Sequence, residues 1–129
     1  MIYNLMGYLI TQLPAIDFVA NGWVEASPVN SVLLRQSGGD FANWYSRKDF
    51  AIQILSRAET SVVAKEQIDD VFDLLKNKLR LLLPAKTVNS VVYPAVQTYQ
   101  TSPVQVPGYI GADEANLEMW SVNFRITTD

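Results

Sequence analysis

The strongest constraint on the fold is an alternating segment near the end of the chain, residues 117–126. Side chains of a β-strand point alternately to its two faces, so every second residue shares a face. Buried on a core face, a large apolar side chain contributes roughly 1.5–3 kcal/mol. The pattern therefore predicts a half-buried closing strand. The residues on its expected core face are Trp120, Val122, Phe124 and Ile126. The residues on its polar face are Ser121, Asn123 and Arg125.

A segment punctuated by proline and glycine, Pro103–Asn116, precedes this strand. It contains Pro107, Gly108 and Gly111, which favour turns over regular structure. We therefore expect a long irregular loop beside the strand. Long ordered loops are usually functional, so this loop is a candidate site.

Two helices are expected where apolar residues recur at helical spacing. The first starts near Ile2 and ends before Pro14. The second runs from about residue 62 to 82, is capped by Thr60 or Ser61, and is stopped by Pro84. Its basic residues from Lys76 to Arg80 are expected in its last turns, where cations complement the helix dipole. Its expected buried stripe is Ile68, Val71, Phe72, Leu75, Leu79 and Leu82.

The remaining strands are expected on either side of the second helix. Asp49–Arg57 has the clearest alternation. Residues 32–36 form another strand, which ends at Gly38, Gly39 and Asp40. Residues 91–101 form a third, in which Pro94 marks a sheet edge or a bulge because proline has no N–H to donate. Asn21 and Gly22 indicate a short hairpin earlier in the chain.

This order of elements predicts an α+β fold. We expect a mostly antiparallel β-sheet with two helices packed on one face. The chain has 129 residues and shows no internal repeat, low-complexity tract or linker. We therefore expect one domain that spans residues 1–129.

Composition excludes several kinds of site. The chain has no Cys and no His, which rules out disulfides, zinc sites built on those residues, and Ser-His-Asp or Cys-His catalysis. The net charge of −3 argues against a basic nucleic-acid-binding surface.

The apolar N-terminus has no basic residue before Arg35 and is shorter than the roughly 20 residues of a membrane span. We therefore expect a cytoplasmic protein without a membrane partner.

Clustered carboxylates are the remaining candidates for chemistry. Asp69, Asp70 and Asp73 share a predicted helix with Lys65 and Lys76, which indicates a solvated charged face and no metal site.

Asp113 and Glu114 could bind a cation with nearby carbonyl oxygens, or they could form a turn or an interface salt bridge. Calcium loops gather more oxygen ligands at regular spacing, which favours the latter. We expect no catalytic residue, metal or cofactor, and hence no enzyme.

Three segments carry a resemblance to a known family. The first is Ser27–Gly39, with Pro28, Asn30 and a Gly-Gly pair; the second is Arg47–Ala58 with the amphipathic helix after it. The third is Gly111–Glu114, followed by the Ser-Val-Asn-Phe-Arg strand that ends at Arg125. In this order and at this chain length, they resemble the tail terminator proteins of long-tailed bacteriophages, also called minor capsid or tail completion proteins.

The resemblance implies a structural role. Such proteins form a ring, usually a hexamer, on the end of the completed tail tube. The ring stops tube polymerisation and presents a surface to the head. The implied partners are copies of the same chain, the tail tube protein and the head–tail connector protein, while DNA passes through the ring without specific binding. The implied location is the head–tail junction of the virion, after assembly in the host bacterial cytoplasm.

The two loops are the places where we expect contacts between subunits or with the tube. The aromatic-rich segment Asp40–Ser46 either folds onto the core or meets a partner, and Pro103–Asn116 is the second loop. Aromatic side chains often dominate interface energy, and alanine at an interface aromatic should weaken assembly without unfolding the chain. The interface candidates are Phe41, Trp44, Tyr45, Tyr109, Asp113 and Glu114.

Other functions stay open at this point. One is a different head–tail joining protein, such as a head-closure or connector-adaptor component. Another is a small ligand-binding or enzymatic α+β domain, which would need a pocket with convergent polar groups around Asp113 and Glu114. A third is a nucleic-acid binder, which the acidic net charge disfavours.

Overall fold

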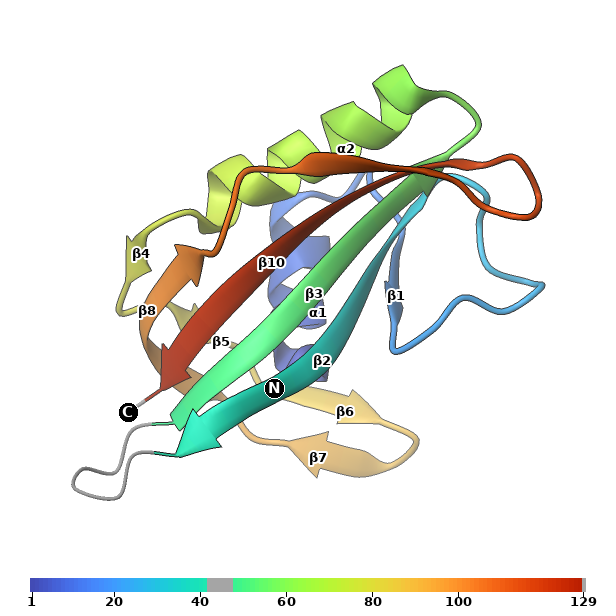
Figure 1. Cartoon of the computed structure of the whole chain (residues 1–129). Coiled ribbons are helices and arrows are strands. Elements are labelled where there is room, and N and C mark those ends of the chain that lie inside the picture. Colours follow the sequence, from blue (N-terminus) through green and yellow to red (C-terminus); the bar gives the residue numbers. More distant parts are fainter. Residues whose placement is uncertain (42–47, 129) are drawn as a thin grey trace.

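The computed structural model describes residues 1–41 and 48–128 (Figure 1). Among these residues, eight strands form one sheet, in the order β1-β2-β3-β10-β8-β4, with β5 added beside β8 and β9 beside β10, while β6 and β7 form a separate hairpin. The elements are α1 (Ile2–Gln12), β1 (Phe18–Ala20), β2 (Ser31–Phe41), β3 (Lys48–Ala58), α2 (Ser61–Leu75), β4 (Lys78–Leu79), β5 (Leu82–Leu83), β6 (Lys86–Val88), β7 (Val91–Tyr93), β8 (Val96–Pro103), β9 (Gly108–Ala112) and β10 (Glu118–Thr128).

The closing strand β10 lies at the centre of the sheet. It pairs antiparallel with β3 along its whole length, so that Phe124 lies opposite Ile52 and Ile126 opposite Phe50. Its alternation is confirmed: Val122, Phe124 and Ile126 are almost fully buried. Trp120 is only partly buried and lies at the margin of the core.

Both helices cover one face of this sheet, which confirms the α+β fold (Figure 1). Apolar residues from α1 and α2 meet the inward side chains of β2, β3 and β10 in one cluster, because those strands present the same face at alternate positions. The cluster members with the largest fully buried side chains, Leu83 of β5 among them, are Leu5, Leu9, Leu34, Ile52, Ile54, Ile68, Leu75, Leu83, Phe124 and Ile126.

The second helix is shorter than its apolar periodicity predicts. Thr60 caps it, as expected, by accepting a hydrogen bond from the Val63 backbone N–H at 3.3 Å. It ends at Leu75 because Lys76 has extended backbone and Asn77 has a φ of 51°. The prediction that Pro84 stops the helix was therefore wrong. Leu79 and Leu82 are exposed, and the basic residues from Lys76 onward follow the helix and do not lie in its last turns.

The hairpin predicted at Asn21 and Gly22 was also wrong. The chain does turn there, with Asn21 at a φ of 72°, but β1 pairs in parallel with β2. Residues 22–30 form no strand. Trp23 instead donates its indole N–H to Ser31 Oγ at 2.8 Å, and its ring lies against the Arg57 guanidinium.

The prediction that β2 ends at Gly38, Gly39 and Asp40 was wrong. The strand continues through Gly38 and Gly39 to Phe41, with a bulge between Gln36 and Gly38. Gly38 has a φ of 138°, which side chains rarely allow, so glycine lets the strand absorb the extra residue.

The strand expected over residues 91–101 is two strands. β7 ends at Tyr93 and β8 begins at Val96, because Pro94 interrupts the ladder. A buried polar side chain, Asn4, lies beside this break. The Asn4 side-chain amide donates to the carbonyls of Pro84, Tyr93 and Pro94 at 2.9, 3.2 and 2.9 Å, which ties α1 to the β6–β7 hairpin.

Candidate interaction surface

The segment Pro103–Asn116 is not the irregular loop that its prolines and glycines predict. Residues Gly108–Ala112 form β9, which pairs antiparallel with Glu118–Ser121 of β10. A bulge lies at Met119 and Trp120, opposite Gly111, whose φ is 105°. The glycine that suggested a loop therefore supports a bulged hairpin.

Asp113 builds the turn of that hairpin. Its Oδ1 accepts hydrogen bonds from the backbone N–H groups of Ala115 and Leu117, both at 2.9 Å. The backbone adds an Asp113 N–H to Leu117 carbonyl bond at 2.9 Å. Asn116, at a φ of 61°, closes the turn. The expectation of a turn is confirmed for Asp113, while Glu114 is exposed beside it.

Tyr109 lies on the hairpin with half of its surface exposed (51%). Its hydroxyl donates a hydrogen bond to the Glu118 carboxylate, and its ring meets Trp120 edge-on, with centroids 5.8 Å apart. The hydrogen bond to Glu118, followed by desolvation and by the charge of that carboxylate, raises the pKa of Tyr109. The predicted interface residue is therefore held in one orientation and still accessible to a partner.

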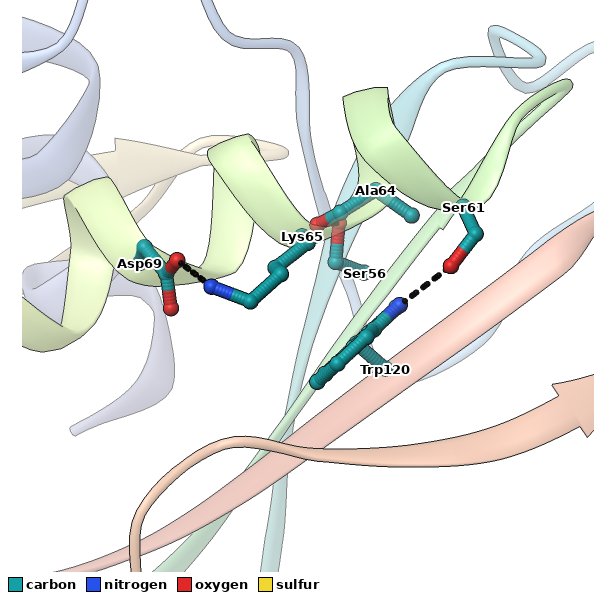
Figure 2. A network of polar contacts seen from close by, with 6 residues as sticks. All are labelled: Ser56, Ser61, Ala64, Lys65, Asp69 and Trp120. Atoms are coloured by element: carbon teal, nitrogen blue, oxygen red, sulfur yellow. Dashed lines mark hydrogen bonds and ion pairs between the residues drawn. The ribbon is translucent and has the colours of Figure 1, made fainter.

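Trp120 connects the hairpin to the start of α2 (Figure 2). Its indole N–H donates to Ser61 Oγ at 3.0 Å, and the Lys65 ammonium lies 5.7 Å from its ring centroid. Lys65 is itself paired with Asp69 at 2.6 Å. A second hydrogen bond joins β3 to α2: the hydroxyl of buried Ser56 donates to the Ala64 carbonyl at 2.8 Å.

The hairpin and the segment before it expose apolar surface. Exposed side chains of this size are tolerated singly, but a cluster of them marks an interaction surface. Val104 and Val106 are exposed in the segment before the hairpin. We call the exposed β9 residues Tyr109 and Ile110, with their acidic neighbours Asp113, Glu114 and Glu118 on the same hairpin, the hairpin patch.

The structure does not bring all predicted interface residues together. Trp44 and Tyr45 lie outside the described residues. The backbone of Phe41 pairs with Lys48, which lies opposite Thr128. Tyr109 pairs with Trp120 at the other end of β10. Trp120 and Thr128 are eight residues apart along that strand, or about 26 Å at the usual strand rise. Phe41 and Tyr109 therefore lie towards opposite ends of the sheet.

The charged face of α2 agrees with the sequence. Lys65 pairs with Asp69 at 2.6 Å and Lys76 with Asp73 at 3.1 Å, with all four side chains partly or largely exposed. Over residues 1–41 and 48–128, no cluster of three or more acidic residues is arranged to hold a metal ion. In the same residues, no helix is long and apolar enough to cross a membrane.

Sequence reasoning missed a second exposed surface. Because it extended α2 through residue 82, it buried Leu79 and Leu82 and gave the neighbouring basic residues a role at the helix end. The signal that could have found the turn is Asn77, since Asn adopts left-handed backbone more readily than most residues.

Comparison with protein-family models gives a match to the bacteriophage tail terminator protein family over residues 17–129. The chain therefore belongs to that family, and the resemblance seen in its sequence is confirmed. It has a structural role in the phage tail, as a virion component that contacts other tail or head proteins. A search of curated proteins found no match.

The family match begins at Asp17, so α1 lies outside it even though Leu5 and Leu9 are completely buried.

Proposed function

We propose that this protein caps the end of the tail tube as a ring, stops tube polymerisation and forms the surface that joins the head connector. Membership of the tail terminator family carries the assignment to the tail. The observation that supports an assembly surface is the hairpin patch, where Tyr109 is exposed yet held by Glu118 and Trp120. A fixed aromatic group loses little conformational freedom when it binds a partner.

A ring, here taken as a hexamer, requires two different surfaces on each copy. Contacts between unlike patches repeat around a rotation axis and close when the rotation divides a full turn. The hairpin patch supplies one such surface. The net charge of −3 suits a channel that DNA crosses without adhering to it, because like charges repel.

The nearest competing function is that of another head–tail joining protein, in the same assembly but on the head side. The two are separated by which partner the chain binds.

Electron microscopy and co-sedimentation with purified tail tubes, and separately with portal–connector complexes, test the proposal. We expect ring-shaped density at one end of the tubes and binding of the protein to those tubes. Binding to connector complexes alone would establish the head-side function instead, and a monomer that ignores both partners would refute the proposed role.

A further inference from the structure

The central sheet has two open edges. Over residues 1–41 and 48–128, β9 pairs only with β10, and β1 covers β2 only at residues 32–34. The rest of β2, from Arg35 to Phe41, therefore has an open side, and so does β9 from Gly108 to Ala112. An open edge presents unpaired backbone N–H and C=O groups, which form a template for another strand.

The two open edges lie on opposite sides of the same four strands. β2, β3 and β10 lie side by side, and β9 follows beyond β10 (Figure 1). Each of these strands is antiparallel to the next, so β9 runs opposite to β2. The copies in a ring are related by rotation about its axis and keep one direction along it. The β9 edge of one copy therefore meets the β2 edge of the next in the antiparallel orientation.

Tyr109 and Ala112 direct their backbone groups outward from β9. Successive residues of an antiparallel strand direct these groups to opposite sides. The Asn123 carbonyl accepts a hydrogen bond from the Val104 N–H at 2.8 Å, so odd-numbered residues of β10 face the side of β8 and β9. Even-numbered residues of β10 face β3. Tyr109 and Ala112 lie opposite even-numbered residues, so their own groups face away from β10.

On the other edge, Gln36 and Gly39 direct their backbone groups outward from β2. The Leu34 carbonyl accepts a hydrogen bond from the Asn21 N–H at 2.8 Å and so faces away from β3. Gln36 and Gly39 lie opposite the next two alternate residues of β3, so they face the same way as Leu34. No described residue of β1 reaches them, because β1 pairs no further than Leu34.

The outward groups have the same spacing on both edges. A regular strand directs its groups outward at every second residue, but each edge contains one extra residue at a bulge. The outward residues are therefore three positions apart in both strands, Tyr109 and Ala112 in β9 and Gln36 and Gly39 in β2. The two edges can pair residue for residue.

From this match we infer that β9 of one copy pairs antiparallel with the open part of β2 in the next copy. Ala112 then lies opposite Gln36, and Tyr109 lies opposite Gly39. The inference rests on the proposed ring and specifies the strands that build it. Main-chain hydrogen bonds of this kind join separate chains when a strand is added to a sheet edge. Because the two strands differ, the contact is heterologous and repeats around a closed ring.

The offset between the two edges suits closure. Tyr109 lies opposite Trp120 of β10, whereas Gly39 lies, across β3, level with Ile126. Residues 120 and 126 are about 20 Å apart along the strand, and the four strands of one copy span about 19 Å across the sheet. Such an offset tilts the strands by about 45° to the ring axis, close to the roughly 35–45° of closed β-barrels.

The β9 edge also lacks the devices that prevent edge pairing. Charged side chains and proline usually protect an open strand, and Gly108–Ala112 contains neither. Four of its residues, Gly108, Tyr109, Ile110 and Ala112, are exposed. A β carbon at Gly108 would meet no atom within 4 Å, so packing inside the copy does not require glycine there. Glycine in a strand lets another backbone approach closely.

Disulfide crosslinking tests the pairing directly, since the chain contains no native cysteine. The full chain is prepared as Ala112→Cys, as Gln36→Cys and as the double variant, at two exposed positions. Each is mildly oxidised at high protein concentration, both free and on tail tubes. Residues that share both hydrogen bonds have α carbons about 5.5 Å apart, which suits a disulfide. We expect no crosslink from either single variant, one dimer from their equimolar mixture, and a ladder of multimers from the double variant.

A matched control pairs Ala112→Cys with Arg35→Cys. Arg35 is also exposed, but it precedes Gln36 and its side chain lies on the other face of the sheet, so this mixture should give no dimer. Dimers from a single variant, or equal crosslinking in the control mixture, would overturn the inference. So would a double variant that caps tubes without forming a ladder, while the proposed function would then stand. A ladder from a protein that leaves tubes uncapped would preserve the pairing and remove the capping role.

Discussion

The indole N–H of Trp120 donates a hydrogen bond to Ser61 Oγ at 3.0 Å and so joins the last strand of the sheet to the first residue of α2. The two residues are 59 positions apart in the sequence. This contact holds the β9–β10 hairpin, which carries the exposed Tyr109, against the helix. It thereby sets the position of the proposed assembly surface relative to the core.

Ser61→Ala should weaken this link. Loss of one hydrogen bond costs about 0.5–1.5 kcal/mol, so the free energy of unfolding measured in urea should fall by that amount. Val62→Ala is the control, because the neighbouring valine is largely exposed and should have little effect. In a double-mutant cycle with Trp120→Phe the losses should not add, and strict additivity would contradict the coupling.

Asn4→Leu should destabilise the contact between α1 and the β6–β7 hairpin. The substitution removes the donor to three carbonyls, and a buried polar group left without its partner costs about 1–3 kcal/mol. Thermal unfolding followed by circular dichroism should show a midpoint lower by several degrees. Gln12→Leu, on the exposed end of the same helix, should change the midpoint little. An unchanged midpoint for Asn4→Leu would contradict the role of Asn4.

Phe124→Ala should be among the most damaging substitutions in the chain. Phe124 is 1% exposed at the centre of the sheet and packs against Phe72, with ring centroids 6.1 Å apart. Removing a buried phenylalanine ring typically costs about 3–5 kcal/mol through lost burial and the cavity left behind. Chemical denaturation measures the loss, and Ile110→Ala on the exposed hairpin should cost far less. Equal losses at the two positions would mean that Ile110 is part of the core.

Alkaline pH should loosen the hairpin. The hydrogen bond to Glu118 raises the pKa of Tyr109 in the folded chain above the ordinary value of about 10. Its stabilising contribution is therefore complete below the unfolded pKa and disappears as the pH rises through the folded one. Phenolate absorbance of the wild type minus that of Tyr109→Phe should isolate a tyrosine that titrates above the ordinary range. A difference curve centred at or below the ordinary value would contradict the Tyr109–Glu118 contact.

Sequence patterns predicted the elements that are long and regular. The alternation through Val122, Phe124 and Ile126 identified the central strand, and Thr60 identified the start of α2, because burial and capping leave local signals. The end of α2 was misplaced because Leu79 and Leu82 continue the apolar period of the helix, although both side chains are exposed and lie after its end. A single left-handed residue, Asn77, overrides that period, and its backbone conformation is not visible in a hydrophobic pattern.

The candidate site was predicted in part. Tyr109 and Asp113 were identified as belonging to one surface, but the segment around them was expected to be a loop, since Pro107, Gly108 and Gly111 signal turns. Pairing with β10 overrides that local signal. Asn4 was missed because its role depends on carbonyls 80 to 90 residues away, which no local pattern reports. Long-range pairing and long-range hydrogen bonds therefore account for the remaining errors.

The most direct test of the capping function is the length of tail tubes that grow in the presence of this protein. Purified tail tube protein is polymerised with increasing amounts of the wild-type chain or of Ile110→Asp, and tube lengths are measured by electron microscopy. Capping predicts that the wild type shortens the tubes in proportion to its concentration and places a ring at one end, while Ile110→Asp leaves them long. Tubes of unchanged length with bare ends at saturating wild-type protein would contradict the account.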